Sequence, residues 1–339
     1  MDDALDQRLL NDWQHRFPLR PRPFDALARA CGVDEAQVLQ RLARLREQGF
    51  FSRIGAVWNA GAGGAALLCA MAVPAERLDT VAALVGRHPG VNHSYEREHL
   101  LNLWFVLTGA RADALQRDLD ALEAASGLTV LRLPMRRAYR IDLGFDLAGG
   151  ATASALRPPP PAAASAPLAP QHHALAALAE EGLALEPRPY ARWARQLGMD
   201  EPALHARLQD WLDGGQLRRF GIVVRHHELG YAANAMCVFD APDDAVDALG
   251  ARLAAQPGVT LCYRRERAPG WRYNLFCMLH GRERGAVLAL LARARAAAGL
   301  EALPQDVLFS LRRFKQCGAR YFAEPSAEPA WLAPEHDHA

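Results

Sequence analysis

The stretch Arg53-Ile54-Gly55-Ala56-Val57 recurs in the second half of the chain as Arg219-Phe220-Gly221-Ile222-Val223. At the same spacing, Pro21-Arg22-Pro23 returns as Pro187-Arg188-Pro189. Self-similarity at one long period is the mark of a duplicated structural unit. Because an ordinary domain has roughly 100 to 150 residues, the 339 residues are predicted to hold two copies of one multidomain unit.

The N-terminal part of each half has the pattern of a helix-turn-helix. A short helix is expected over Phe24–Cys31, and Asp34 is a favourable N-cap for a second, apolar-periodic helix that stops at Gly49. In the second half, Asp200 begins the equivalent helix, which ends at Gly214-Gly215. The strand that follows, with the Arg-Ile/Phe-Gly-x-Val signature, is expected to form the wing of a winged helix.

The remainder of each half alternates as βαββαβ, the ferredoxin-like order. Strands of the first half are expected around 66–73, 92–98, 101–108 and 129–137, with helices at 75–87 and 112–124. The second half has the same elements around 233–239, 244–255, 260–265, 273–280, 284–297 and 306–315. The predicted fold class is therefore α+β, a tandem repeat of a winged helix-turn-helix and a ferredoxin-like domain.

Composition gives the domain limits. Residues 148–171 are rich in Ala, Pro, Ser and Gly, which predicts a linker that does not pack into a core. We expect helix-turn-helix domains at 1–60 and 172–225, and ferredoxin-like domains at 61–147 and 226–324. The polar segment 325–339 is predicted to be a flexible tail.

Composition also excludes several classes of protein. Half of the residues are apolar and 23% are charged, as in globular proteins. No apolar run approaches the roughly 20 residues of a membrane span, and the acidic start Met1–Asp6 is unlike a secretory signal. We expect a cytoplasmic protein without membrane contact.

The six cysteines are scattered and have no zinc-site spacing, so reduced, mostly buried thiols are expected. A formal net charge of +1 argues against a protein that binds chiefly by neutralising a phosphate backbone. Lys315 is the only lysine, and every other basic residue is arginine, which forms two-pronged bonds to carboxylates.

A helix-turn-helix followed by a ferredoxin-like domain resembles the Lrp/AsnC family of transcriptional regulators. Three stretches are more specifically similar to the siroheme decarboxylases: residues 219–231, Gly90-Val91-Asn92-His93-Ser94-Tyr95-Glu96-Arg97, and Tyr273-Asn274-Leu275-Phe276. Those enzymes serve heme d1 synthesis and the alternative, siroheme-dependent route to heme. They are usually pairs of related subunits, and the resemblance implies that both are fused here.

The resemblance implies a carboxy-lyase that removes the C12 and C18 acetate carboxylates of siroheme. The products are didecarboxysiroheme and CO2. No separate cofactor is implied, because the substrate brings its own iron. A ligand with eight carboxylates requires many cations held in fixed geometry.

Two histidines are the candidate catalytic residues. His93 lies in a predicted strand, and the second half has Leu261 at the equivalent position. His226 lies in the second half, where the first half has no histidine. Protonation of carbon after loss of CO2 suits imidazole, which titrates near neutrality. We therefore expect these two side chains to supply acid catalysis or, for one of them, an axial contact to the substrate iron; His227 is a weaker candidate.

A larger set of residues is predicted to bind the substrate, chiefly as cations that pair with its carboxylates. Each half closes with two adjacent arginines. About half of the arginines are expected only to solvate strand edges or to pair with surface acids. The set is Arg53, Tyr95, Arg97, Arg136, Arg137, Arg219, Arg225, His227, Arg264, Arg265, Arg312 and Arg313. Tyr263 and Cys262 are expected to be core residues.

Two other functions stay open. A DNA-binding regulator of the Lrp/AsnC type needs basic side chains at the start of its recognition helix. Here the two helices begin Asp34-Glu35 and Asp200-Glu201, which disfavours contact with phosphates. A non-catalytic heme sensor would use the same histidines as ligands. The fused halves could act as a monomeric pseudo-dimer or as a homodimer, with other proteins of heme d1 synthesis as further partners.

Overall fold

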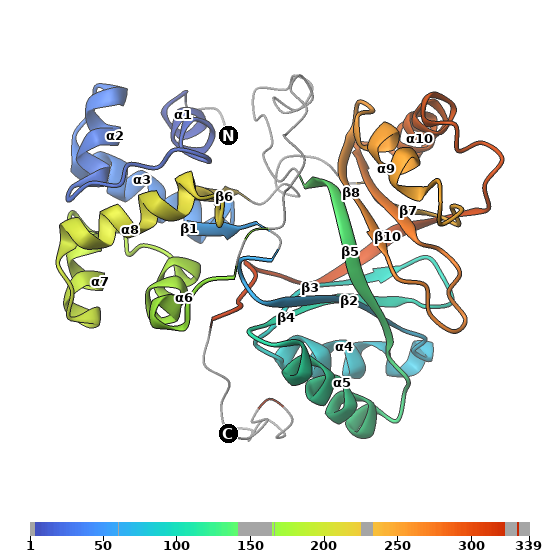
Figure 1. The fold of residues 1–339 in the computed structure, drawn as a ribbon. Helices are drawn as coiled ribbons and strands as arrows, with labels where there is room; N and C mark the ends of the chain where they lie inside the picture. Colours follow the sequence, from blue (N-terminus) through green and yellow to red (C-terminus); the bar gives the residue numbers. More distant parts are fainter. Residues whose placement is uncertain are drawn as a thin grey trace. The chain divides into compact units, whose positions relative to one another are not determined.

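The structure is a computed structural model that describes residues 4–59, 61–141, 165, 167–224, 233–322 and 331. The chain divides into two compact units, and neither unit corresponds to one repeat. Both helix-turn-helix copies form one unit, the helix-turn-helix unit, and both ferredoxin-like copies form the other, the barrel unit. Figure 1 shows the elements of each unit.

The helix-turn-helix unit contains the predicted helix pair and strand twice, and each set is preceded by a helix that the sequence analysis did not predict, α1 (Ala4–Asp12) or α6 (His173–Glu181). The other elements are α2 (Pro23–Cys31), α3 (Glu35–Glu47) and β1 (Phe51–Trp58), then α7 (Pro189–Leu197), α8 (Glu201–Asp213) and β6 (Leu217–Val224), with a 3-10 turn at Pro170–His172. Gly32 and Gly198 end α2 and α7 with φ of 71° and 62°, which glycine adopts without strain. Asp34 and Gln37 form the capping box of α3.

The strand predicted to be a wing pairs with its counterpart from the other half. β1 and β6 are antiparallel and form a two-stranded sheet with Gly55 opposite Gly221. The main chain runs directly over both glycines. A Cβ on Gly221 would lie 2.4 Å from the carbonyl oxygens of Trp13 and Gln14, and one on Gly55 would lie 2.5 Å from that of Ala179. The glycine of the repeated motif is therefore required by packing.

The barrel unit contains the βαββαβ order twice, as predicted. The first copy has β2 (Ala65–Met71), a 3-10 turn (Ala75–Arg77), α4 (Leu78–Arg87), β3 (Val91–Arg97), β4 (Leu103–Gly109), α5 (Ala112–Ser126) and β5 (Leu131–Ile141). The second has β7 (Ala233–Phe239), α9 (Val246–Ala254), β8 (Val259–Arg265), β9 (Leu275–Gly281), α10 (Arg284–Ala298) and β10 (Gln305–Gln316). The predicted fold class is confirmed.

The last strand of each copy crosses into the sheet of the other copy. The first part of β5 pairs with β2, and the part from Met135 onward pairs with β8. Likewise, β10 pairs first with β7 and then, from Ser310 onward, with β3. The eight strands close into one barrel in the order β10-β3-β4-β2-β5-β8-β9-β7. Closure leaves neither half with an exposed sheet edge.

Side chains alternate between the two faces of the barrel wall. One face of each copy packs on its own helices, α4 and α5 or α9 and α10 (Figure 1). The opposite face of both copies shares one cluster without helix residues, which includes Leu68, Trp104, Val238 and Phe276. This shared face is the inside of the barrel, and we call it the inner face.

The C-terminal segment returns to the first copy of the barrel unit. Trp331 lies edge-on to the ring of His88, with 4.6 Å between centroids, and His88 is 3.2 Å from the Asp118 carboxylate. The remainder of the predicted tail lies outside the described residues. Among the described helices, none has the length and hydropathy that crossing a bilayer requires.

Replacing Gly221 with alanine tests the packing of the repeated motif. The new Cβ would overlap two main-chain carbonyls, so we expect the free energy of unfolding to fall by about 1–3 kcal/mol, measured by urea denaturation. The control is Gly285→Ala in α10, where an added Cβ meets no atom within 4 Å. An equally stable Gly221→Ala protein would contradict this account of the motif.

Candidate active site

One strand carries three of the predicted site residues on the inner face. His93, Tyr95 and Arg97 alternate along β3, and His93 and Tyr95 face Val106 and Trp104 across the ladder. The rings of His93 and Tyr95 lie 28° from parallel, with 6.3 Å between centroids. The barrel thus presents an imidazole, a phenol and a guanidinium in one row.

His93 is uncharged at neutral pH. Burial lowers the pKa of its imidazole to about 4, because the charged ring would lose its hydration. Its Nδ1 lies 2.6 Å from Oδ1 of Asn92. Thr108 in turn lies 3.3 Å from the Asn92 amide nitrogen. The sequence analysis did not predict Asn92 or Thr108 as site residues. The difference between the halves at this position, Asn92 in the first and Thr260 in the second, could have indicated Asn92.

Tyr95 and Arg97 have exact counterparts in the second copy, Tyr263 and Arg265. Each buried arginine anchors the crossing strand: Arg97 Nη1 donates to Leu308 O at 3.0 Å, and Arg265 Nη1 donates to Leu133 O at 2.8 Å. Each also lies over its own tyrosine ring, at 5.5 Å and 4.8 Å from the centroids. Burial lowers the pKa of Arg97 to about 10, so it remains a cation at neutral pH.

The two arginine pairs are not equivalent position by position. Tyr95 faces Arg313 across the ladder, whereas its counterpart Tyr263 faces Ala138. Thus Arg313 corresponds to Ala138, and Arg312 corresponds to Arg137. The adjacent arginines that close each half are therefore offset by one residue between the two copies.

Arg140 and Lys315, further along the same two strands, support this register. Arg140 Nη1 donates to Ala254 O at the end of α9, and Lys315 Nζ donates to Gly86 O and His88 O at the end of α4. Cations at helix C-termini are favourable because the last carbonyls carry partial negative charge. The single lysine therefore has a structural position.

The inner face is consequently asymmetric. Arg313 is exposed, and its Nη1 donates to Gln316 Oε1 at 2.9 Å. Its charge opposes the rise that burial causes in the pKa of Tyr95. The β3 and β10 side has His93 and Arg313 where the opposite side has Leu261 and Ala138. A polar, cationic surface therefore exists on one side of a pseudo-symmetric barrel.

Four of the predicted arginines bind acids on the outside of the barrel unit. The pairs are Arg136–Glu266 at 2.6 Å, Arg137–Asp247 at 3.0 Å, Arg264–Asp243 at 3.6 Å, and Arg312 with Asp79 at 2.7 Å and with Glu96 at 3.1 Å. Such exposed pairs contribute about 0–1 kcal/mol each. They agree with the expectation that part of the arginine set solvates the surface.

Two further arginines lie in the helix-turn-helix unit. Arg53 Nη2 donates to Ala56 O at 2.9 Å, and Arg219 Nη1 donates to Ile222 O at 3.0 Å. Equivalent side chains thus stabilise equivalent strands. The predicted residues Arg225, His226 and His227 lie outside the described residues.

One end of the inner face is filled by an aromatic side chain that sequence analysis overlooked. Asn102 and Asn274 close equivalent hairpins, but the β8–β9 hairpin is longer and places Trp271 in the inner cluster. Trp271 is 3% exposed and lies edge-on to Trp104, with 5.1 Å between centroids. The sequence feature that could have indicated this difference is the insertion in the second half that carries Pro269-Gly270.

Cys262 and the other thiols behave as expected. Burial raises the pKa of Cys69 to about 12 and also raises that of Cys262. These two buried thiols therefore stay protonated and act as small apolar side chains. All six cysteines are free of disulfides.

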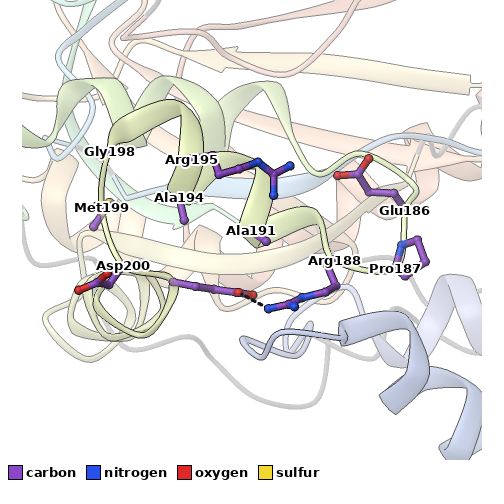
Figure 2. Close-up of a pocket in the computed structure, with 10 residues that line it drawn as sticks. Glu186, Pro187, Arg188, Ala191, Ala194, Arg195, Gly198, Met199 and Asp200 are labelled. Carbon is purple, nitrogen blue, oxygen red and sulfur yellow. Dashed lines mark hydrogen bonds and ion pairs between the residues drawn. The ribbon is translucent and has the colours of Figure 1, made fainter.

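The helix-turn-helix unit has a surface pocket between α7 and the start of α8 (Figure 2). An ion pair between Arg188 and Glu201, 2.9 Å apart, crosses it, and Glu186, Asp200 and Arg195 also line it. Arg22 and Glu35 form the equivalent pair in the first copy. Acids at the start of both second helices would repel a phosphate backbone.

The fold and site define a chain with two AsnC-like domains joined to two helix-turn-helix domains. Family models agree: an AsnC-like ligand binding domain matches residues 62–140 and 228–315, and a siroheme decarboxylase NirDL-like helix-turn-helix domain matches 6–51 and 173–218. The chain belongs to the siroheme decarboxylase family.

Relatives match the whole chain and its halves. The siroheme decarboxylase NirDL subunit of Paracoccus denitrificans (strain Pd 1222) is 47% identical over 321 residues, 94% of this chain and 97% of the relative. The siroheme decarboxylase NirL subunit of Stutzerimonas stutzeri is 50% identical and covers 45% of this chain and 91% of its own length. The crystal structure of the siroheme decarboxylase NirDL with an iron-uroporphyrin III analogue is similar, with 27% identity, a TM-score of 0.64 and 94% coverage of both chains.

Replacing Trp271 with alanine tests the filled end of the barrel. Loss of a buried indole should lower the free energy of unfolding by about 3–5 kcal/mol, measured by chemical denaturation. Leu288→Ala on α10 is the control, because that side chain is 43% exposed and should change stability by less than about 0.5 kcal/mol. Equal effects of the two substitutions would argue against the proposed packing.

Proposed function

We propose that this chain is a siroheme decarboxylase that converts siroheme to 12,18-didecarboxysiroheme and two molecules of CO2, in heme d1 or alternative heme biosynthesis. The observation that carries the proposal is full-length membership of the siroheme decarboxylase family. The asymmetric row of His93, Tyr95 and Arg97 beside Arg313 agrees with it. The free thiols support action in the reducing cytoplasm.

The reaction sets clear demands on the protein. Cleavage of the bond between the acetate methylene and its carboxylate leaves electrons that the conjugated macrocycle can delocalise, and carbon must then be protonated. The protein has to orient the ring, neutralise the carboxylates that stay, and exclude competing reactions. Arg313 is a guanidinium on the asymmetric side with exposed surface, so it is the described arginine best suited to hold a substrate carboxylate.

A DNA-binding regulator is the weaker alternative. The surfaces at the start of α3 and α8 are acidic, and the arginines beside them are paired with Glu35 and Glu201. The exposed positions of α8 include Ala203, Ala206 and Asp210, which offer no cation to a phosphate. A heme sensor would differ from a decarboxylase because it would bind siroheme without converting it.

Anaerobic incubation of the purified protein with siroheme, followed by mass analysis of the tetrapyrrole, tests the function. We expect the loss of two carboxylates. His93→Ala and His226→Ala should each lower turnover by about 10²–10⁴-fold if they transfer protons. The control is His99→Gln, at a side chain whose Nε2 lies 3.4 Å from the Asp306 carboxylate, and it should keep turnover. Unchanged siroheme with the wild-type protein would reject the enzyme, and a shift of duplex DNA at physiological salt would favour the regulator.

Arg313→Gln tests carboxylate binding on the asymmetric side. Loss of a charged hydrogen bond costs about 1.5–3 kcal/mol, so KM for siroheme should rise roughly 10- to 100-fold. Arg312→Gln is the matched control, because Arg312 binds Asp79 and Glu96 on the outer face. Similar KM values for the two variants would remove Arg313 from the substrate site.

A further inference from the structure

A chain of hydrogen bonds runs from the main chain to His93. Oγ1 of Thr108 lies 3.0 Å from the carbonyl oxygens of both Gly90 and Arg320. A carbonyl oxygen can only accept a hydrogen bond, so the single hydroxyl proton of Thr108 is directed to one of these two. The oxygen of Thr108 is then left as an acceptor for its other neighbour.

That neighbour is the side-chain amide of Asn92, which is 3% exposed. Because Thr108 has to accept, the Asn92 group that faces it is the NH2, at 3.3 Å. The amide oxygen of Asn92 therefore faces His93, at 2.6 Å from Nδ1. This oxygen accepts as well, so Nδ1 of His93 must carry the proton.

The second ring nitrogen follows from the first. In a neutral imidazole with the proton on Nδ1, Nε2 has a lone pair and cannot donate. Within the described part of the chain, Nε2 of His93 has no hydrogen-bond partner. A lone pair without a partner suits an electron-pair acceptor, and iron is the metal centre that an iron tetrapyrrole supplies.

We propose that Asn92 and Thr108 are positioning residues that fix His93 as the Nδ1–H tautomer, so that Nε2 binds the iron of the tetrapyrrole substrate. This proposal rests on the proposed function. Metal-binding histidines generally owe their tautomer to such a second hydrogen bond. Of the two roles that sequence analysis left open for this imidazole, the network selects the iron contact over proton donation.

The second copy of the barrel lacks the same arrangement. Thr260 stands where Asn92 does, and its Oγ1 lies 3.2 Å from Met278 O and 3.1 Å from Nδ1 of His280. The position of His93 is occupied by Leu261, which has no lone pair. Among the described residues of the barrel unit, the network therefore orients an imidazole on the asymmetric side that carries Arg313.

Binding of iron-uroporphyrin III, followed by absorption and electron paramagnetic resonance spectra, tests the iron contact. The wild-type complex should show a nitrogen ligand that His93→Ala loses and that added imidazole restores. In Asn92→Leu and Thr108→Val, the apparent affinity of the nitrogen ligand for the iron should fall by about 10–100-fold. Thr108→Ser keeps the hydroxyl and should keep the wild-type affinity. Thr260→Val is the matched control from the second copy and should leave the spectra unchanged.

The outcomes separate this proposal from the proposed function. Identical spectra for the wild type and His93→Ala, in proteins with unchanged thermal unfolding, would overturn the iron contact even if siroheme is decarboxylated. Normal spectra in both Asn92→Leu and Thr108→Val would overturn their positioning role. An intact nitrogen signature together with absent siroheme turnover in the wild type would reject the proposed function and leave the iron contact standing.

Discussion

The pairing of each crossing strand with the other copy is the constraint on which the barrel unit depends. Without it, the edges of β3 and β8 would present unpaired N–H and C=O groups, which are costly and prone to aggregation. The buried cations Arg97 and Arg265 reinforce the crossing, because each donates to the carbonyl of a residue in the crossing strand. Neither copy closes a barrel alone, so the smallest complete inner face needs both.

A shared inner face allows the copies to specialise. Positions that hold the crossing strands are the same in both copies, as with Arg97 and Arg265. Positions beside them differ, and the differences gather on one side, where Leu261 and the smaller Ala138 replace a polar ring and a cation. In a symmetric homodimer every substitution would occur twice. Fusion into one chain allows each copy to change independently. A tetrapyrrole with unequal substituents can then contact two different sides of the inner face.

The sequence predicted the fold well and the site only in part. The repeat, the N-caps and the alternating apolar pattern depend on local chemistry, and the structure confirms the two unit types built from them. Strand pairing between the copies is a long-range property that local patterns do not reveal. The strand after each helix-turn-helix was therefore expected to be a wing, whereas β1 and β6 pair with each other. A shift of one residue exchanges the two faces of a strand, so the adjacent arginines of the two halves could not show from the sequence that Arg313 lies opposite Tyr95.

The role of His93 shows most clearly what sequence reasoning lacks. Residue type alone suggests an acid, because imidazole titrates near neutrality, and nothing in the order of residues reveals which nitrogen holds the proton. That choice is made by main-chain carbonyls, the Thr108 hydroxyl and the Asn92 amide, which the fold brings together from different parts of the chain. If the imidazole binds iron, the proton that reaches carbon must come from another group, and the mechanism divides its tasks between different side chains of one asymmetric chain.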